Sequence, residues 1–144
     1  MEANRIKKLQ EKIQNDRGIP FLLTDLSNIF YLTGFTGSSG FLMIFPHFPP
    51  VFLCDGRYTT QAKEELKISA EIVEFSRDVY TKIAEIMSSK NFQTVYFETS
   101  LSYHSFLSLK EKNFELIPAP NWVEEMRAIK TPDELELIEK ALHL

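Results

Sequence analysis

The stretch that decides the fold is Tyr31-Leu32-Thr33-Gly34-Phe35-Thr36-Gly37-Ser38-Ser39-Gly40. Its glycines recur at intervals of three, which allows positive φ angles and close approach of another chain segment or a ligand. A phosphate loop would need Gly-Lys-Ser or Gly-Lys-Thr, and a dinucleotide loop would need a helix where the apolar run Phe41 to Phe45 follows. From the residues alone, this glycine loop is best interpreted as a connection between elements.

Short apolar runs on both sides of the glycine loop predict strands. Phe21 to Leu23 is a continuous run closed by polar residues, which is the pattern of a strand covered on both faces. Phe41 to Phe45 and Val51 to Cys54 are joined through three prolines, which cannot continue a ladder. These two runs therefore predict a hairpin with a five-residue connection.

Strand and helix patterns alternate along the rest of the chain. Ile6, Leu9 and Ile13 have helical spacing, and Gly18 follows where a left-handed helix cap is usual. Further helices are predicted from Tyr58 to about Leu66, after Asp78 as N-cap, and from Leu101 to Lys112, and further strands from Ala70 to Phe75, Val95 to Phe97 and Phe114 to Ile117. The predicted fold class is therefore α/β, with a mixed, mostly six-stranded sheet and flanking helices.

Composition excludes several classes of protein. The chain has 144 residues, of which 44% are apolar and 25% are charged, so one globular domain is expected. Its net charge of -4 includes no basic block able to replace the counterions of a nucleic acid. The sequence has no run of about 18 apolar residues and no apolar stretch behind its charged start, so neither a membrane span nor a secretion signal is predicted. The single cysteine, Cys54, cannot form an internal disulfide, and a cytoplasmic location fits best.

Searches for metal ligands and nucleophiles find no candidate. The histidines His47, His104 and His143 are widely separated, no His-Glu-x-x-His is present, and Cys54 has no histidine beside it in the sequence. We expect His47 and His104 to be exposed. The acidic residues at helical positions are interpreted as solvated faces: Glu64, Glu65, Glu124, Glu125, Glu134 and Glu136. We therefore predict no catalytic residue and no metal site in this chain.

The second motif, Asp55-Gly56-Arg57-Tyr58, ends one predicted strand and starts a helix. Asp55 could cap the turn or pair with Arg57, whose planar guanidinium suits a carboxylate. The carboxyl ends of strands in open α/β sheets are common places for ligands. Two interpretations stay open, a structural turn held by a local ion pair and a contact to a ligand.

The carboxyl end carries a strong start signal for a helix. Thr131-Pro132-Asp133-Glu134 is a capping box with proline at the first helical position. Apolar residues keep helical spacing after it, and no glycine, asparagine or proline stop signal precedes Leu144. We expect a domain over residues 1–130 and the start of an interdomain helix over residues 131–144, with the chain either cut at that helix or ending naturally in a frayed one.

Three ordered motifs resemble the amino-terminal domain of the creatinase, prolidase and aminopeptidase P family. Tyr31 to Gly40 is similar to the family's Tyr-Leu-Thr-Gly-Phe segment. Asp55 to Tyr58 with Gln61-Ala62 is similar to its Asp-Gly-Arg-Tyr-x-x-Gln-Ala segment, and Arg127 to Ala141 resembles its interdomain helix. The resemblance implies the fold of the creatinase N-terminal domain, which is ribonuclease H-like.

Within the family, the glycine loop is more similar to the aminopeptidase P branch, because Gly-Phe-Thr-Gly-Ser is followed by a further glycine. The resemblance therefore implies a parent hydrolase that acts on peptides with proline at the second position and removes the residue before it. Its chemistry would use two divalent metal ions, commonly manganese, held by a carboxyl-terminal domain. This chain is too short to contain that domain, so it would hold no cofactor itself and would be inactive alone.

By the same resemblance, this domain borders the mouth of the active site and contributes to a homodimer interface. Tyr31, Phe35, Arg57 and Tyr58 are the candidates for substrate-side or interface residues. Two alternatives stay open. One is the N-terminal domain of an Xaa-Pro dipeptidase, or prolidase. The other is a stand-alone creatinase-like module that binds a peptide or protein without catalysis.

Overall fold

Helices and strands alternate along residues 1–128, the part of the chain that the computed structural model describes. The strands are β1 (Phe21–Leu23), β2 (Phe41–Ile44), β3 (Val51–Asp55), β4 (Glu71–Phe75), β5 (Thr94–Phe97) and β6 (Glu115–Pro118). The helices are α1 (Glu2–Asp16), α2 (Leu26–Thr33), α3 (Thr59–Glu65), α4 (Val79–Ser89), α5 (Tyr103–Lys110) and α6 (Trp122–Ala128). All of the strands predicted from the sequence are present.

Within residues 1–128, β2 is the one strand that runs against the others. The strand order is β4-β3-β2-β1-β5-β6. β2 pairs antiparallel with β1 and β3, whereas β1 with β5, β5 with β6, and β3 with β4 are parallel pairs. The predicted hairpin and the predicted mixed sheet are therefore confirmed, and β4 is an edge strand as its half-exposed pattern indicated.

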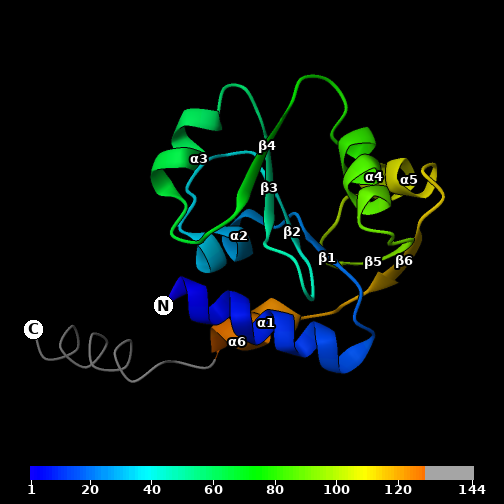
Figure 1. The fold of residues 1–144 in the computed structure, drawn as a ribbon, viewed down its shortest axis with the longest axis horizontal. Helices are drawn as coiled ribbons and strands as arrows, with labels where there is room; N and C mark the ends of the chain where they lie inside the picture. Colours follow the sequence, from blue (N-terminus) through cyan, green and yellow to red (C-terminus); the bar gives the residue numbers. More distant parts are fainter. Residues whose placement is uncertain (129–144) are drawn as a thin grey trace, which may run out of the picture.

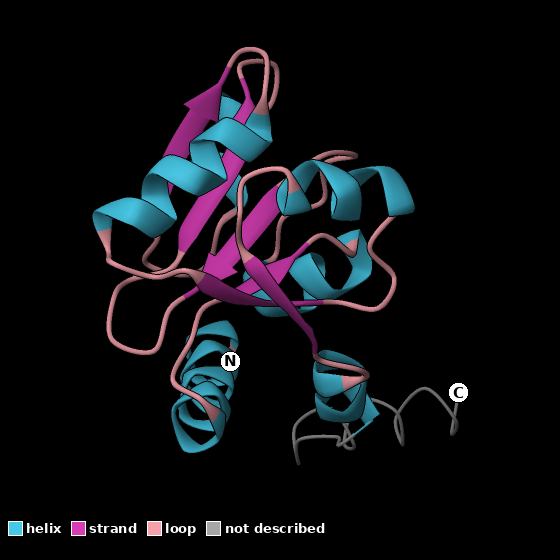
Figure 2. Cartoon of the chain, turned by 90° about the vertical axis from the view of Figure 1, so that its right-hand side faces the viewer, coloured by secondary structure: helices cyan, strands magenta, loops and turns pink. Residues whose placement is uncertain are grey.

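Helices cover both faces of the sheet (Figure 1). Phe21 and Leu23 belong to a core shared with α1, α2, α3 and α6, whereas Leu22 between them belongs to a core shared with α4 and α5. This alternation follows from the two-residue period of a strand. Figure 2 shows the same layers from a second direction. The apolar runs that predicted the strands are continuous because both faces are covered.

The helices that the sequence predicts within residues 1–128 are confirmed. α1 buries Ile6, Leu9 and Ile13, and Gly18 after it has a φ of 67°. The side chain of Asp78 accepts a hydrogen bond from the backbone at the start of α4. α3 and α5 lie within the segments expected for them.

Two helices, α2 and α6, are missing from the sequence prediction. Tyr31 to Thr33 was assigned to the glycine loop, but these residues form the last turn of α2. The helix forms because Asp25 caps its first turn and Gly34, with a φ of 86°, ends it in the left-handed conformation. Both signals are readable in the sequence, so this prediction was wrong for a reason that local chemistry explains.

Several expectations concern exposure or lie outside the described residues. His47 and His104 are exposed, as predicted. None of the helices in residues 1–128 is long and apolar enough to cross a membrane. The capping box at Thr131, the helix expected after it and the expected domain boundary after residue 130 lie outside the described residues.

Candidate functional site

The glycine loop is packed against the sheet by Phe35. The ring of Phe35 is 1% exposed, and its centroid lies 4.7 Å from that of Phe52. A Cβ atom at Gly37 would overlap the Phe35 ring, and one at Gly40 would lie 2.7 Å from Cζ of Phe52. These two glycines therefore allow close packing, whereas Gly34 supplies the positive φ.

Polar contacts join the outer side of the loop to α3 and to the turn before it. The backbone N–H and hydroxyl of Thr36 donate to Oε1 of Glu65 at 2.9 and 2.7 Å. The hydroxyls of Ser38 and Tyr58 lie 2.6 Å apart. The Thr36 hydrogen bonds lower the pKa of the Glu65 carboxyl. Glu65 therefore binds the loop and is not simply part of a solvated face; we call Phe35, Thr36, Ser38, Tyr58 and Glu65 the glycine-loop cluster.

The turn after β3 is held by a bidentate ion pair. Nε of Arg57 donates to Oδ1 of Asp55 at 3.1 Å, and Nη2 donates to Oδ2 at 3.0 Å. The Arg57 side chain stays 79% exposed, and its guanidinium lies 5.5 Å from the Tyr58 ring centroid. The Arg57 side chain lowers the pKa of the Asp55 carboxyl. A hollow of about 770 Å³ opens beside this pair, with Glu74 and Lys82 on its wall.

Tyr31 lies apart from the other three candidates, on the side of α2 that faces α1 and α6. The guanidinium of Arg5 lies 3.9 Å from the Tyr31 ring centroid and donates to the Tyr31 carbonyl at 2.8 Å. The Tyr31 hydroxyl donates to the carbonyl of Met126 at 3.2 Å. The structure therefore brings Phe35, Arg57 and Tyr58 together and places Tyr31 at a junction of three helices.

A buried carboxylate that sequence reasoning missed lies directly after β5. Glu98 is 4% exposed, and its Oε1 accepts from the backbone N–H groups of Thr24 and Asp25 at 2.7 and 2.9 Å. Its Oε2 accepts from Nδ2 of Asn28 at 2.6 Å. Burial raises the pKa of the Glu98 carboxyl, against the hydrogen bonds that it accepts. The sequence offers one signal, an acidic residue at the carboxyl end of an apolar strand, which by itself does not distinguish a buried carboxylate from a solvated one.

Asn28 extends this set of contacts to α6. Asn28 is 1% exposed, and its Oδ1 accepts from Nη1 of Arg127 at 3.0 Å. Its Nδ2 also donates to the exposed Glu124 at 3.1 Å, so Glu124 does more than line a solvated face. We call Glu98, Asn28 and Arg127 the Glu98 network.

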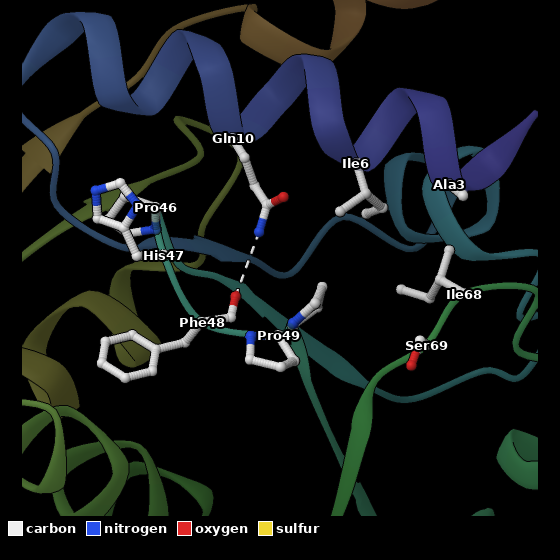
Figure 3. Close-up of a pocket in the computed structure, with 10 residues that line it drawn as sticks. Ala3, Ile6, Gln10, Pro46, His47, Phe48, Pro49, Ile68 and Ser69 are labelled. Atoms are coloured by element: carbon white, nitrogen blue, oxygen red, sulfur yellow. Dashed lines mark hydrogen bonds between the residues drawn. The ribbon is translucent and has the colours of Figure 1, made fainter.

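A second hollow lies between α1 and the β2–β3 connection (Figure 3). It measures about 430 Å³ and is bordered by Ile6, Phe48 and Ile68 among others. Nε2 of Gln10 donates across it to the carbonyls of Phe45 and Phe48 at 3.0 and 3.3 Å. The side-chain amide of Gln10 thus fastens the β2–β3 connection to α1.

The residues of the described part do not fit a metal centre. Among residues 1–128, no group of three or more His, Cys, Asp or Glu side chains could hold a metal ion. A centre of two divalent ions needs several carboxylate or imidazole ligands around each ion. The carboxylates that do converge, Glu98 and Glu124, are occupied by amide groups.

Comparison with known proteins assigns the fold to a family. The model of the Creatinase/Prolidase N-terminal domain matches residues 5–129. This chain belongs to that family. The resemblance read from the glycine loop and the Asp55 turn is therefore confirmed, and so is the expected fold class.

Related proteins of this family carry peptidase names. The protein named "Uncharacterized peptidase YqhT" from Bacillus subtilis is 34% identical over 123 residues, covering 83% of this chain and 34% of that protein. The solved Xaa-Pro dipeptidase from Bacillus anthracis has a TM-score of 0.86 at 27% identity, covering 97% of this chain and 39% of that one. An Xaa-Pro aminopeptidase structure from Streptococcus pyogenes has a TM-score of 0.80 at 25% identity, covering 86% of this chain and 95% of that one. This chain spans about a third of the length of the curated relatives that it matches.

Proposed function

We propose that this chain is the non-catalytic N-terminal domain of a metal-dependent Xaa-Pro peptidase, and that it borders an active site held elsewhere in the longer protein. One observation carries the proposal: the chain superposes over 97% of its length on 39% of an Xaa-Pro dipeptidase. A non-catalytic role also fits the side chains of residues 1–128, among which no group of three or more His, Cys, Asp or Glu could hold a metal ion. The metal ions would be bound by residues outside the described part.

Arg57 and Tyr58 are our proposed substrate-side residues. The guanidinium is exposed although Asp55 already uses Nε and Nη2, so further donors of the planar group remain for a peptide carboxylate or carbonyl. Tyr58 shares this surface with Arg57. Phe35 is buried and would act on the site only by holding the glycine loop. Tyr31 contacts α6 of the same chain, so we propose for it a role at the junction of α2 with α6 and not at the substrate.

The longer protein allows this role to be measured. Arg57→Ala should raise KM for an Xaa-Pro peptide while kcat and metal content change little, because a rim contact contributes binding and no chemistry. Arg17→Ala, at an exposed arginine after α1, is the control and should leave KM unchanged. An unchanged KM in Arg57→Ala would remove Arg57 from the substrate side.

The finer proposal is an aminopeptidase and not a dipeptidase. It is supported by the sequence of the glycine loop, which is more similar to the aminopeptidase P branch. In that loop, Thr36 binds Glu65 of α3, and Ser38 contacts the Tyr58 hydroxyl. The longer protein should therefore hydrolyse Xaa-Pro tripeptides and longer peptides. Activity confined to Xaa-Pro dipeptides would favour the prolidase alternative.

A homodimer in the cytoplasm completes the proposal, on the strength of the family resemblance. Sedimentation velocity of the longer protein should give the mass of a dimer at micromolar concentration. A monomeric mass at all concentrations would contradict the proposed dimer.

The reading frame after Leu144 separates the peptidase from the binding module. The proposal expects a continuation of about 200 residues or more, the length of a second domain, that contains spaced aspartate, histidine and glutamate ligands. A stop codon directly after Leu144 would contradict the proposal and favour the stand-alone module.

A further inference from the structure

The direction of the Asn28 side-chain amide is fixed by its neighbours. Its Nδ2 points at carboxylate oxygens, 2.6 Å from Oε2 of Glu98 and 3.1 Å from Oε2 of Glu124. Its Oδ1 faces the Arg127 guanidinium at 3.0 Å. An ionised carboxylate only accepts hydrogen bonds and a guanidinium only donates them, so the opposite amide orientation would place like groups together on both sides.

Of the two carboxylates beside Asn28, Glu98 is the one held in place. The backbone N–H groups of Thr24 and Asp25 fix its other oxygen, and the side chain is buried. Glu124 is exposed and can turn into solvent. Buried hydrogen bonds are also stronger than exposed ones, because the surroundings screen them less. Glu98 therefore decides which end of the Asn28 amide is available to α6.

We propose that Glu98 is a positioning residue: by orienting the Asn28 amide, it makes Oδ1 the acceptor that holds Arg127 and thereby fixes the carboxyl-terminal turn of α6 against the sheet. The contacts link positions that lie 70 and 99 residues apart in the sequence. The other end of α6 is held differently, by Trp122, whose ring centroid lies 4.6 Å from that of Tyr96 and 5.5 Å from that of Phe21.

The consequence for a peptidase rests on the proposed function. The chain continues beyond α6 toward residue 129, where the family match ends. In the longer protein, the direction in which the chain leaves this domain would then be set by Glu98. Amide exchange in α6 can be measured on the 144-residue chain itself, so the result does not depend on any peptidase activity.

Glu98→Gln gives the first arm of the test. The new amide can still accept from Thr24 and Asp25, but it presents an N–H₂ group to Asn28, which must then rotate and turn its own N–H₂ group toward Arg127. Hydrogen–deuterium exchange of the α6 amides at pH 8 should become about tenfold faster or more, the size expected for one hydrogen bond to a charged group. Exchange in α4, on the opposite face of the sheet, serves as the internal reference.

The polarity swap is the decisive arm. In the double substitution E98Q/N28D, the residue at 98 donates and the carboxylate at 28 accepts from both 98 and Arg127, so the hydrogen bonds among these three positions are restored with the same total charge. Glu124 loses its donor at position 28, but it is exposed and can turn into solvent. In this double variant, amide exchange in α6 should return to within about threefold of the rate in the unsubstituted chain. In N28D alone, exchange should be faster than in E98Q, because the carboxylate at 28 then lies beside that of Glu98. This rescue distinguishes positioning from a general loss of packing.

Glu124→Gln is the matched control and should change α6 exchange by less than about twofold, because an exposed contact contributes little.

Three results would overturn the proposal: α6 exchange unchanged in E98Q, a double variant as fast as E98Q, or E124Q as fast as E98Q. Should E98Q fail to fold, the comparison of N28D with E98Q/N28D still decides, because the proposal requires the double variant to be the slower of the two. Fluorescence of Trp122, the single tryptophan of the chain, reports independently whether α6 stays in place.

Discussion

The glycine-loop cluster and the Glu98 network differ in depth and in reach. Polar contacts of the cluster are exposed, or nearly so, and join residues 20 to 29 positions apart. Those of the Glu98 network are buried or half-buried and join positions 70 to 99 apart. The cluster fastens the glycine loop to α3 and to the turn before it, whereas the network fastens the last described helix to the carboxyl ends of β1 and β5. The more visible motif in the sequence is thus the more local one in the structure.

The largest effect should come from the apolar part of the glycine-loop cluster. Phe35→Ala removes a fully buried ring and should lower the free energy of unfolding by about 3–5 kcal/mol. Urea denaturation measures this, and Phe30→Ala, at an exposed ring on α2, should stay within about 0.5 kcal/mol of the unsubstituted chain. Similar losses in both variants would mean that Phe35 is not part of the core.

The next effect compares a buried with an exposed hydrogen bond. Asn28→Ala leaves one oxygen of Glu98 without its amide partner and should cost about 1.5–3 kcal/mol of unfolding free energy. Ser38→Ala removes the exposed contact to Tyr58 and should cost no more than about 0.5 kcal/mol. Equal costs for the two substitutions would erase the contrast between the two regions.

The pH dependence of stability isolates the charge of Glu98. Burial raises its folded-state pKa above the ordinary value of 4.5, so just above that value the folded chain holds a proton that the unfolded chain has released. Stability should therefore fall as pH rises from 4.5 through the raised folded-state pKa. Among the described residues, Asp25 and Glu124 are charged groups beside the network, and Arg127 is the charged group within it besides Glu98.

Glu98→Gln should remove this part of the pH dependence, as measured by urea unfolding at a series of pH values. Glu115→Gln, at an exposed position on β6, should leave it in place. A profile for Glu98→Gln that is parallel to that of the unsubstituted chain would show that Glu98 is not the titrating group.

The smallest effect should come from the Asp55–Arg57 pair. Arg57→Ala should leave the urea midpoint unchanged within experimental scatter, because an exposed pair is screened by solvent. The measurable change is in titration: the pKa of Asp55 should rise toward its ordinary value once the guanidinium is gone, as NMR of the carboxyl would detect. An unmoved pKa would mean that Arg57 does not hold the turn in solution.

Local signals in the sequence account for most of the fold. Runs such as Phe21 to Leu23 predicted the strands because both faces of the sheet are covered, and prolines marked the hairpin. α2 is missing from the prediction because Tyr31 to Thr33 continue directly into the glycine loop in the sequence, although Asp25 and Gly34 mark the two ends of the helix. Of the two helices missing from the prediction, α2 is therefore explained by local chemistry.

The site could be predicted only in part. The pairing of Asp55 with Arg57 followed from two neighbouring residues, and the structure contains it. The burial of Phe35 depends on Phe52, and the environment of Glu98 depends on partners 70 or more residues away. Without the tertiary fold, a glutamate after a strand cannot be distinguished from a solvated one, because its chemistry is set by what packs around it.

The most direct test of the central claim, that this domain borders a peptidase site without containing it, is an activity assay of the purified 144-residue chain. Hydrolysis of an Xaa-Pro peptide is followed with manganese added, beside the longer protein as positive control. We expect turnover by the longer protein and none above buffer by the 144-residue chain. Turnover that co-purifies with the 144-residue chain and is lost on metal chelation would contradict it.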